Sequence, residues 1–146
     1  MLSIKEITKE DVGLCFELDS KTISLWSIKQ WEEELIKKGV KVFKLSLLND
    51  VIGICAIQLV IDEAQINYFS VNQKFRRKGF GSYFMNYLIN ICKELHIKKI
   101  ILEVSETNNA AINFYNHFNF FTVGIRKTYF KDGSDAFLKE KLLRKK

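Results

Sequence analysis

The sequence predicts an α/β protein built on a mixed, mostly antiparallel β-sheet with helices on both faces. Three observations support this fold class: the length, the alternation of strand and helix patterns, and a strand–helix–strand crossover in the second half. The chain has 146 residues and no proline, and no low-complexity tract or internal repeat marks a boundary within it. Because this length is typical of one domain, we expect a single domain over residues 1–146.

The first half of the chain shows the element order β-α-α-β-β-β. Apolar periodicity predicts a strand over residues 3–7, helices over 8–20 and 27–38, and strands over 40–48, 51–61 and 65–71. Ser27 and Gln30 have the spacing of a capping box at the start of the second helix, and Gly39 marks its end. The dipeptide Asn49-Asp50 is typical of a turn between two strands of an antiparallel meander.

The second half continues as α-β-α-β-β. The pattern predicts a helix over residues 79–95, a buried strand over 97–104, a short helix over 108–118, and strands over 120–126 and 136–142. The full order is therefore β-α-α-β-β-β-α-β-α-β-β. A helix that connects two neighbouring strands makes them parallel, so the sheet must be mixed. In such sheets, ligands bind where neighbouring strands diverge next to a helix N-terminus. In this chain, that place is the junction after the fourth strand.

Composition excludes several classes of protein. The chain is 47% hydrophobic and 27% charged, which is typical of a globular domain rather than a disordered one. Its longest apolar run, Val51–Ile57, is too short to cross a bilayer, and the first residues lack the apolar core of a signal peptide. Three cysteines with apolar neighbours, Cys15, Cys55 and Cys92, favour packed thiols in a cytoplasmic protein.

The net charge of +6 favours an anionic partner such as nucleic acid, the ribosome or a phosphorylated small molecule. Only four of the 23 basic residues are arginines, although arginine is the side chain that most often reads bases and phosphates. We therefore expect a general basic surface, with no direct nucleic-acid binding and no membrane partner.

The segment after the fourth strand carries a basic, glycine-containing loop, residues 72–82, that leads into a long helix. Glycines let a backbone approach an anion closely, and the first N–H groups of a helix lack internal partners. Together they form a site suited to a pyrophosphate. The segment lacks the P-loop pattern and the third glycine of the dinucleotide fingerprint. A basic turn whose glycines serve packing is the alternative interpretation.

Two further residues are candidates for chemistry, Glu103 and Tyr115. Strand alternation places Glu103 on the face opposite Leu102 and Val104, where its carboxylate should meet a polar cleft or water because burial without a partner is costly. Tyr115 follows a helix start that Thr107 or Asn108 would cap. The alternatives are a solvated glutamate at the end of a strand and a tyrosine that only packs in the core. The two histidines have no matching ligand cluster, so no metal is expected.

The hexad Arg76-Arg77-Lys78-Gly79-Phe80-Gly81 matches the R/Q-x-x-G-x-G/A motif of the GCN5-related N-acetyltransferases (GNAT superfamily). Within that superfamily the chain resembles the ribosomal-protein alanine N-terminal acetyltransferases over nearly its whole length. The resemblance is carried by Trp26-Ser27, Asp62-Glu63-Ala64, Leu102-Glu103-Val104, Asn108, Ala110-Ala111-Ile112, Tyr115, Phe120, Arg126, Tyr129 and Asp135-Ala136. The chain departs from the family pattern at Leu25, Asn119 and Phe130.

The resemblance implies a role for each matching residue. Glu103 corresponds to the general base and Tyr115 to the general acid of a direct acetyl transfer from acetyl-CoA. The implied cofactor-binding residues are Phe69, Ser70 and Val71 at the strand end, Arg77, Lys78, Gly79, Phe80, Gly81 and Ser82 in the loop, and Asn108. The implied acceptor is a protein N-terminus, specifically the alanine of a small-subunit ribosomal protein. A small-molecule or lysine amine, or a non-catalytic basic module that binds the ribosome or nucleic acid, is the alternative.

Overall fold

The computed structural model describes residues 1–76 and 78–143, which form a seven-stranded sheet in the order β1-β2-β3-β4-β5-β7-β6. The elements are β1 (Leu2–Ile7), η1 (Lys9–Asp11), α1 (Val12–Ser20), α2 (Ile28–Ile36), β2 (Val40–Leu47), β3 (Asp50–Val60), β4 (Glu63–Val71), η2 (Gln73–Phe75), α3 (Phe80–Glu94), β5 (Lys99–Ser105), α4 (Asn109–His117), β6 (Phe121–Arg126) and β7 (Ala136–Leu142). Among the strands of these residues, only β4 and β5 pair in parallel. The predicted element order and the mixed, mostly antiparallel sheet are confirmed.

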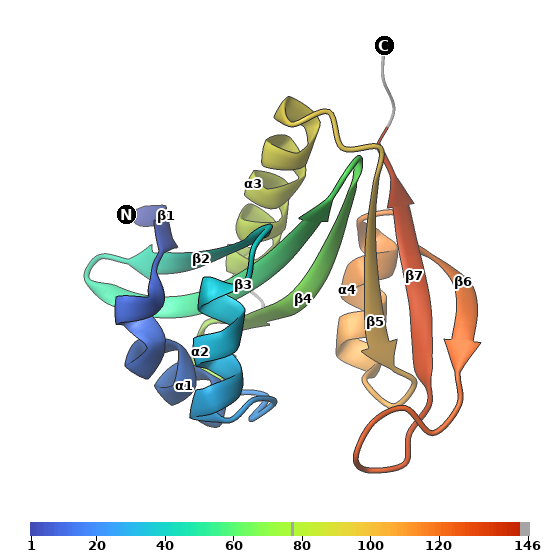
Figure 1. Cartoon of the computed structure of the whole chain (residues 1–146), viewed down its shortest axis with the longest axis horizontal. Coiled ribbons are helices and arrows are strands. Elements are labelled where there is room, and N and C mark those ends of the chain that lie inside the picture. The colour runs from blue at the N-terminus through green and yellow to red at the C-terminus, as the bar shows by residue number, and fades with distance from the viewer. Residues whose placement is uncertain (77, 144–146) are drawn as a thin grey trace.

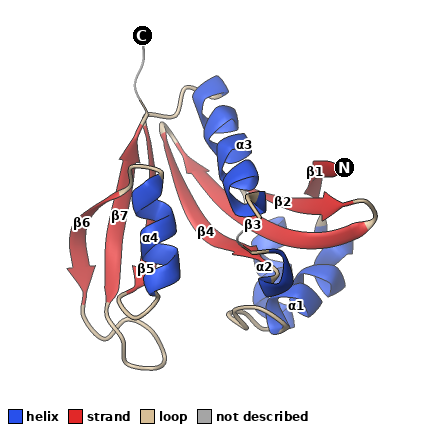
Figure 2. Ribbon diagram, turned by 180° about the vertical axis from the view of Figure 1, so that it is seen from behind, coloured by secondary structure: helices blue, strands red, loops and turns tan. Residues whose placement is uncertain are grey.

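Helices lie on both faces of this sheet, as predicted. α1 and α2 cover β2, β3 and β4 on one face, and α3 and α4 lie on the opposite face (Figure 1; Figure 2). The core beneath α3 and α4 includes Phe84 and Leu88, and the core beneath α1 and α2 includes Trp31 and Tyr68. The front face of β5, β7 and β6 in Figure 1 carries no helix from the described part of the chain.

The ends of the first two helices differ from the predicted ones. The first helix begins as a 3-10 turn, and its α-helical part starts at Val12. The capping box is confirmed, because the Ser27 hydroxyl accepts from the Gln30 N–H and the Gln30 side chain accepts from the Ser27 N–H. That helix stops at Ile36 because Lys37 is extended and Gly39 is left-handed, with φ of 83°, which turns the chain into β2.

The parallel pair β4–β5 is hydrogen-bonded over only part of its length. Pairing runs from Glu63–Lys99 to Ile66–Leu102, and beyond it the two strands diverge (Figure 1; Figure 2). A β-bulge lies at the same point, because Ile66 and Tyr68 face consecutive residues of β3 and Asn67 is left unpaired. Since a bulge bends and twists its strand, it accounts for the separation of β4 from β5. This opening is the strand divergence that the sequence predicts.

The three cysteines Cys15, Cys55 and Cys92 are buried and free, which confirms the expectation of packed thiols. Burial raises the pKa of the Cys92 thiol to about 11, so it remains protonated near neutral pH. No helix among the described residues is long and apolar enough to cross a membrane.

Candidate active site

Glu103 is the first residue of β5 beyond its last pair with β4, so its side chain lies where the two strands separate. The predicted alternation is confirmed: Ile100, Leu102 and Val104 are buried in the core beneath α3 and α4, and Glu103 points to the other face. Its side chain is 18% exposed. The Glu103 carboxylate therefore lies beside the opening on the face opposite α3 and α4.

Two side chains hold the Glu103 carboxylate. The Nε atom of Arg126 lies 2.6 Å from Oε2, and the hydroxyl of Tyr129 donates to Oε1 at 3.0 Å. The Arg126 guanidinium also lies 5.6 Å from the centroid of the Tyr129 ring, a cation–π distance. Burial and the hydrogen bond to Glu103 raise the pKa of the Tyr129 phenol, so it remains a donor. Sequence reasoning gave neither residue a role, because no local spacing links them to Glu103.

A cavity of about 160 Å³ adjoins this carboxylate. It is lined by Gln65, Ile101, Leu102, Glu103, Val123, Arg126, Leu138, Lys139 and Glu140. Its polar groups come from β4, β5, β6 and β7, the strands on both sides of the opening. Such a cavity can hold a small amine next to a charged acceptor of protons.

Tyr115 lies on α4, on the other side of the sheet from the Glu103 side chain. Its ring packs between Phe114 and Phe120, with both centroid distances at 5.5 Å. It belongs to the core that contains Val71, the last residue of β4, and Val104, the residue before the last of β5. Burial raises the pKa of its phenol far above the ordinary value, so the hydroxyl keeps its proton. Glu103 and Tyr115 therefore lie on opposite faces of the sheet.

The glycine-containing loop ends at α3, whose N-cap residue is Gly79. Tyr83 donates the first helical backbone bond, to the Gly79 carbonyl at 3.0 Å. The N–H groups of Phe80, Gly81 and Ser82 precede it, and no side chain caps this helix end. The helix start that the sequence predicts for this loop is present, Arg77 lies outside the described residues, and anion binding at this helix end stays a prediction.

The two glycines of the loop serve different purposes. Gly79 is left-handed, with φ of 82°, and a Cβ placed there would meet no atom within 4 Å. A Cβ on Gly81 would lie 3.4 Å from the Phe114 ring, so this glycine lets α3 approach α4 closely. The Arg76 Nε atom donates to the Val71 carbonyl at 3.1 Å and fixes the start of the loop to the end of β4.

The strand end that was predicted to bind the cofactor, Phe69, Ser70 and Val71, lies in the diverging part of β4. Phe69 packs on Phe84 and Phe114, with centroid distances of 5.4 and 5.6 Å. Since this segment pairs only with β3, every second backbone group points away from β3 toward the opening. The Val71 carbonyl already accepts from Arg76, and the other groups that point away from β3 face the space between the strands.

Asn108, not Thr107, caps α4: its side-chain oxygen accepts from the Ala111 N–H at 3.1 Å. This settles the two candidates for the cap and places Asn108 at the end of α4 that follows β5. Asn119, where the family pattern has glycine, is left-handed with φ of 66°. Asparagine tolerates that conformation better than most residues.

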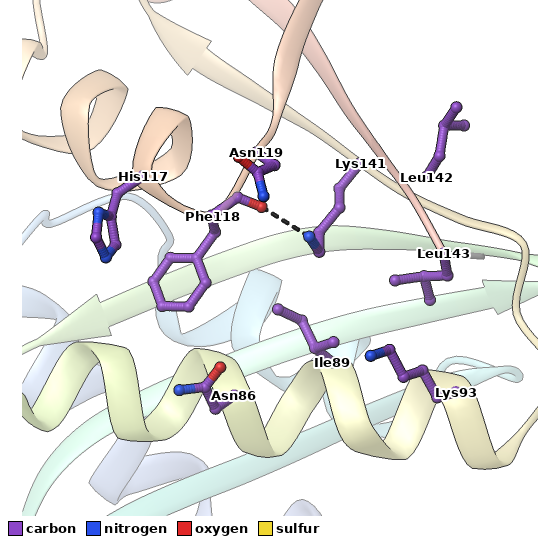
Figure 3. A pocket seen from close by; sticks show the side chains of 9 residues that line it. All are labelled: Asn86, Ile89, Lys93, His117, Phe118, Asn119, Lys141, Leu142 and Leu143. Atoms are coloured by element: carbon purple, nitrogen blue, oxygen red, sulfur yellow. Dashed lines mark hydrogen bonds between the residues drawn. The ribbon is translucent and has the colours of Figure 1, made fainter.

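A second cavity, of about 370 Å³, lies at the C-terminal ends of α3 and α4 beside the end of β7 (Figure 3). None of the predicted site residues lines it. Lys141 donates to the Phe118 carbonyl at 2.8 Å, which stabilises the C-terminal end of α4. Within residues 1–76 and 78–143, no group of metal-ligating side chains has the arrangement needed to hold an ion.

A sheet that opens between its two parallel strands, beside a glycine-capped helix and a half-buried glutamate, is the arrangement that the resemblance to the N-acetyltransferases implies. The family model of the acetyltransferase (GNAT) family matches residues 6–120, and the chain belongs to this family. The protein is accordingly an enzyme, an N-acetyltransferase, and the acetyltransferases of this fold take their acetyl group from acetyl-CoA.

Relatives with a more specific name are similar over most of the chain. A putative [ribosomal protein bS18]-alanine N-acetyltransferase of Bacillus subtilis is 27% identical over 140 residues, which cover 93% of this chain and 92% of the relative. The [ribosomal protein bS18]-alanine N-acetyltransferase of Haemophilus influenzae is 33% identical over 133 residues, 89% of this chain and 88% of the relative. The crystal structure of the Escherichia coli ribosomal-protein-S18-alanine N-acetyltransferase has the same fold, with a TM-score of 0.91, 23% identity and coverage of 100% and 96%.

Proposed function

We propose that this enzyme acetylates the N-terminal α-amino group of a protein, and that its acceptor is the N-terminal alanine of a small-subunit ribosomal protein. The observation that carries the proposal is the position of Glu103 at the strand opening, on the face that α3 and α4 leave free. Relatives named as ribosomal-protein alanine acetyltransferases, similar over about nine-tenths of the chain, support the choice of acceptor.

The residues around the loop suit acetyl-CoA. Lys78 and the N–H groups of Phe80, Gly81 and Ser82, together with Arg77, would bind the pyrophosphate, because a helix N-terminus favours an anion. The backbone of Phe69, Ser70 and Val71 and the side chain of Asn108 would bind the rest of the molecule. Bound acetyl-CoA supplies a thioester, whose carbonyl carbon the amine attacks directly.

Glu103 would take the proton from the attacking amine. An α-amino group with a pKa of about 7.7–8.0 is roughly 10–20% neutral at pH 7, whereas a lysine amine with a pKa near 10.4 is less than about 0.1% neutral. Oε1 of Glu103 accepts a hydrogen bond from Tyr129 and Oε2 forms an ion pair with Arg126, and a carboxylate has further lone pairs that can accept a proton. Because a sizeable fraction of an α-amine is already neutral at pH 7, it needs only modest help from this carboxylate.

Tyr115 would return a proton to the departing thiolate. Its raised pKa keeps the phenol protonated throughout the neutral range. An ordinary thiol has a pKa near 8.5 and an ordinary phenol a pKa near 10, so transfer of the phenol proton to the thiolate is uphill by roughly 2 kcal/mol or more. The transfer therefore needs close contact between the hydroxyl and the sulfur. A backbone N–H near Val71 would stabilise the developing oxyanion.

The test is acetyl transfer from acetyl-CoA to a panel of peptides with free N-termini. We expect turnover with peptides that begin with alanine or serine, and none with the same peptides blocked at the N-terminus. The Glu103→Gln variant is the matched control for catalysis. Free lysine or polyamines that outperform every such peptide would overturn the choice of acceptor, and absence of transfer to any amine would overturn the catalytic assignment.

A further inference from the structure

The larger cavity, of about 370 Å³, has no part in the proposed chemistry (Figure 3). Its volume falls within the range of small-molecule sites, roughly 300–1,000 Å³. It lies beside the C-terminal end of α3, whereas the cofactor loop leads into the N-terminal end. With a rise of about 1.5 Å per residue, Lys93 lies roughly 20 Å along the helix from Gly79. The cavity is therefore separate from the site proposed for acetyl-CoA.

The charged side chains that line this cavity are basic. Lys93 lies in the last turn of α3 and Lys141 near the end of β7, and His117 at the end of α4 adds an imidazole. Among the described residues, no aspartate or glutamate lines the cavity. Figure 3 shows the ammonium groups of both lysines directed into the space between α3 and β7. The cavity thus presents two ammonium groups without a carboxylate beside them.

Neither lysine forms an ion pair with a residue in the ranges 1–76 and 78–143. Lys141 uses one of the three N–H groups of an ammonium on the Phe118 carbonyl, at 2.8 Å, and a ligand can take the others. Burial lowers the pKa of the Lys141 ammonium, and the positive charge of Lys93 lowers it further. The two ammonium groups therefore repel each other, and an anion placed between them would remove that repulsion.

The alternative explanation is that these lysines only stabilise helix ends. A helix C-terminus favours cations, because its last carbonyls lack partners within the helix. At the end of α3, however, the carbonyls of residues 91–93 already accept from the backbone N–H groups of residues 95–97, at 2.9–3.1 Å. At the end of α4, the Phe118 carbonyl accepts from Lys141. Lys93 is therefore not required as a donor at either helix end, and its charge is directed at the cavity.

The other lining residues indicate the chemistry of the ligand. The side-chain amides of Asn86 and Asn119 can donate hydrogen bonds to anionic oxygens. Ile89, Phe118 and Leu142 give the cavity apolar walls, which suit a ring or a short carbon chain. A phosphomonoester carries a charge of about −1.5 to −2 near pH 7. That charge matches two ammonium groups better than the single charge of a carboxylate does.

We propose that this cavity binds a small organic phosphomonoester, with the phosphate group between Lys93 and Lys141 and the carbon skeleton against the apolar wall that includes Phe118. It is a second anion site, at the end of α3 that lies away from the cofactor loop. The inference goes beyond the proposed acetyl transfer and does not depend on the identity of the acceptor amine.

Phenyl phosphate is a suitable probe, because it joins a phosphate group to one ring. It is titrated by calorimetry into the protein saturated with CoA, so that the cofactor loop does not compete for the probe. We expect one equivalent to bind. Benzoate should bind about ten-fold more weakly, since its single charge leaves one ammonium group without a partner. Inorganic phosphate should also bind more weakly than phenyl phosphate, because it lacks the ring that contacts Phe118.

Lys93→Met and Lys141→Met each remove one ammonium group and keep most of the length of the side chain. Each should weaken the binding of phenyl phosphate by about ten-fold, the size of one charge-assisted hydrogen bond. The exposed Lys93 makes the first variant safe for folding, and it leaves the bond between Lys141 and Phe118 intact. It therefore covers the case in which Lys141→Met does not fold.

Lys38→Met is the matched control. Lys38 is an exposed lysine in the connection between α2 and β2, and its removal changes the net charge by the same amount. The control should leave the affinity for phenyl phosphate unchanged. As a second readout, the side-chain amide signals of Asn86 and Asn119 in NMR spectra should shift on addition of the probe to the unaltered protein.

Three results would overturn the proposal. Equal weakening in all three lysine variants would show that the probe responds only to overall charge. Binding that disappears in the presence of CoA, and that neither cavity variant alters, would place the probe in the cofactor loop. Absence of both binding heat and amide shifts would leave the cavity without a phosphate ligand. Failure of the unaltered protein to acetylate any amine would contradict the proposed function alone, because none of these measurements uses catalysis.

Discussion

Glu103 and Arg126 lie on strands that are not neighbours, β5 and β6, yet their side chains form an ion pair of 2.6 Å. The register explains the contact. Glu103 pairs with Leu138 of β7, and Arg126 pairs with Ala136, two residues away on the same face of that strand. The intervening strand thus carries both side chains to one place, and the proposed base has a fixed orientation before any acceptor binds.

Glu103→Gln removes the charge and the basic oxygen and keeps the shape. We expect kcat/KM to fall most at low pH, where little of the α-amine is already neutral. Toward pH of about 9 the solvent deprotonates the amine, so the difference from the unaltered enzyme should narrow. A pH profile of kcat/KM with an alanine-initiated peptide measures this, and a deficit that is the same at every pH would contradict the role of base.

Tyr115→Phe removes one hydroxyl and keeps the packing against Phe114 and Phe120. If the phenol protonates the thiolate, turnover should fall by roughly ten- to ten-thousand-fold. Stability should change little, because burial and not a hydrogen bond to a described residue accounts for the raised pKa of Tyr115. Removal of the hydroxyl then leaves no partner unsatisfied. Turnover and urea unfolding measured on the same preparation separate the two effects, and a fully active variant would leave Tyr115 with packing alone.

Gly79→Ala tests the loop at its left-handed residue. Open space surrounds the position, so the expected loss of about 1–2 kcal/mol of stability comes from the backbone conformation and not from a clash. The N–H groups of the next residues would shift, and acetyl-CoA should bind more weakly by calorimetry.

Gly79→Asn is the control for that variant, since asparagine adopts the left-handed conformation more readily. It should recover most of the stability and most of the acetyl-CoA affinity. Equal affinities for all three proteins would show that the left-handed residue does not shape the cofactor site.

Alkaline titration tests the burial of the tyrosines. Burial is the largest cause of the raised pKa values of Tyr68 and Tyr115. The folded state therefore holds these protons more tightly than the unfolded state does. The stability that results is fully present below pH of about 10, the ordinary phenol pKa, and is lost as the pH rises above it toward the folded-state values.

Ultraviolet absorbance of tyrosinate measures this directly. Just above pH of about 10, the folded protein should show less ionised tyrosine than the urea-unfolded protein, and the free energy of unfolding should decline over the same range. Tyr115→Phe should reduce the difference. Identical titration curves for folded and unfolded protein would contradict the burial of these phenols.

Much of the fold follows from local patterns in the sequence. Alternation in β5 predicts the face on which Glu103 lies, and the spacing of Ser27 and Gln30 predicts the cap of α2, because both depend on residues a few positions apart. The change from strand to helix periodicity predicts the order of the elements, and with it the parallel pair and the loop at its end.

Other features depend on residues that only the folded chain brings together. The bulge at Asn67 arises from the register between β3 and β4, and the pairing of Glu103 with Arg126 arises from the register on both sides of β7. The buried Asp19 has the sequence context of an ordinary residue near a helix end, and the Tyr68 hydroxyl that donates to its carboxylate lies 49 positions away. The sequence determines which elements form because their signals are short-range. The tertiary structure decides which polar groups meet, because burial leaves each of them only the partners that packing supplies.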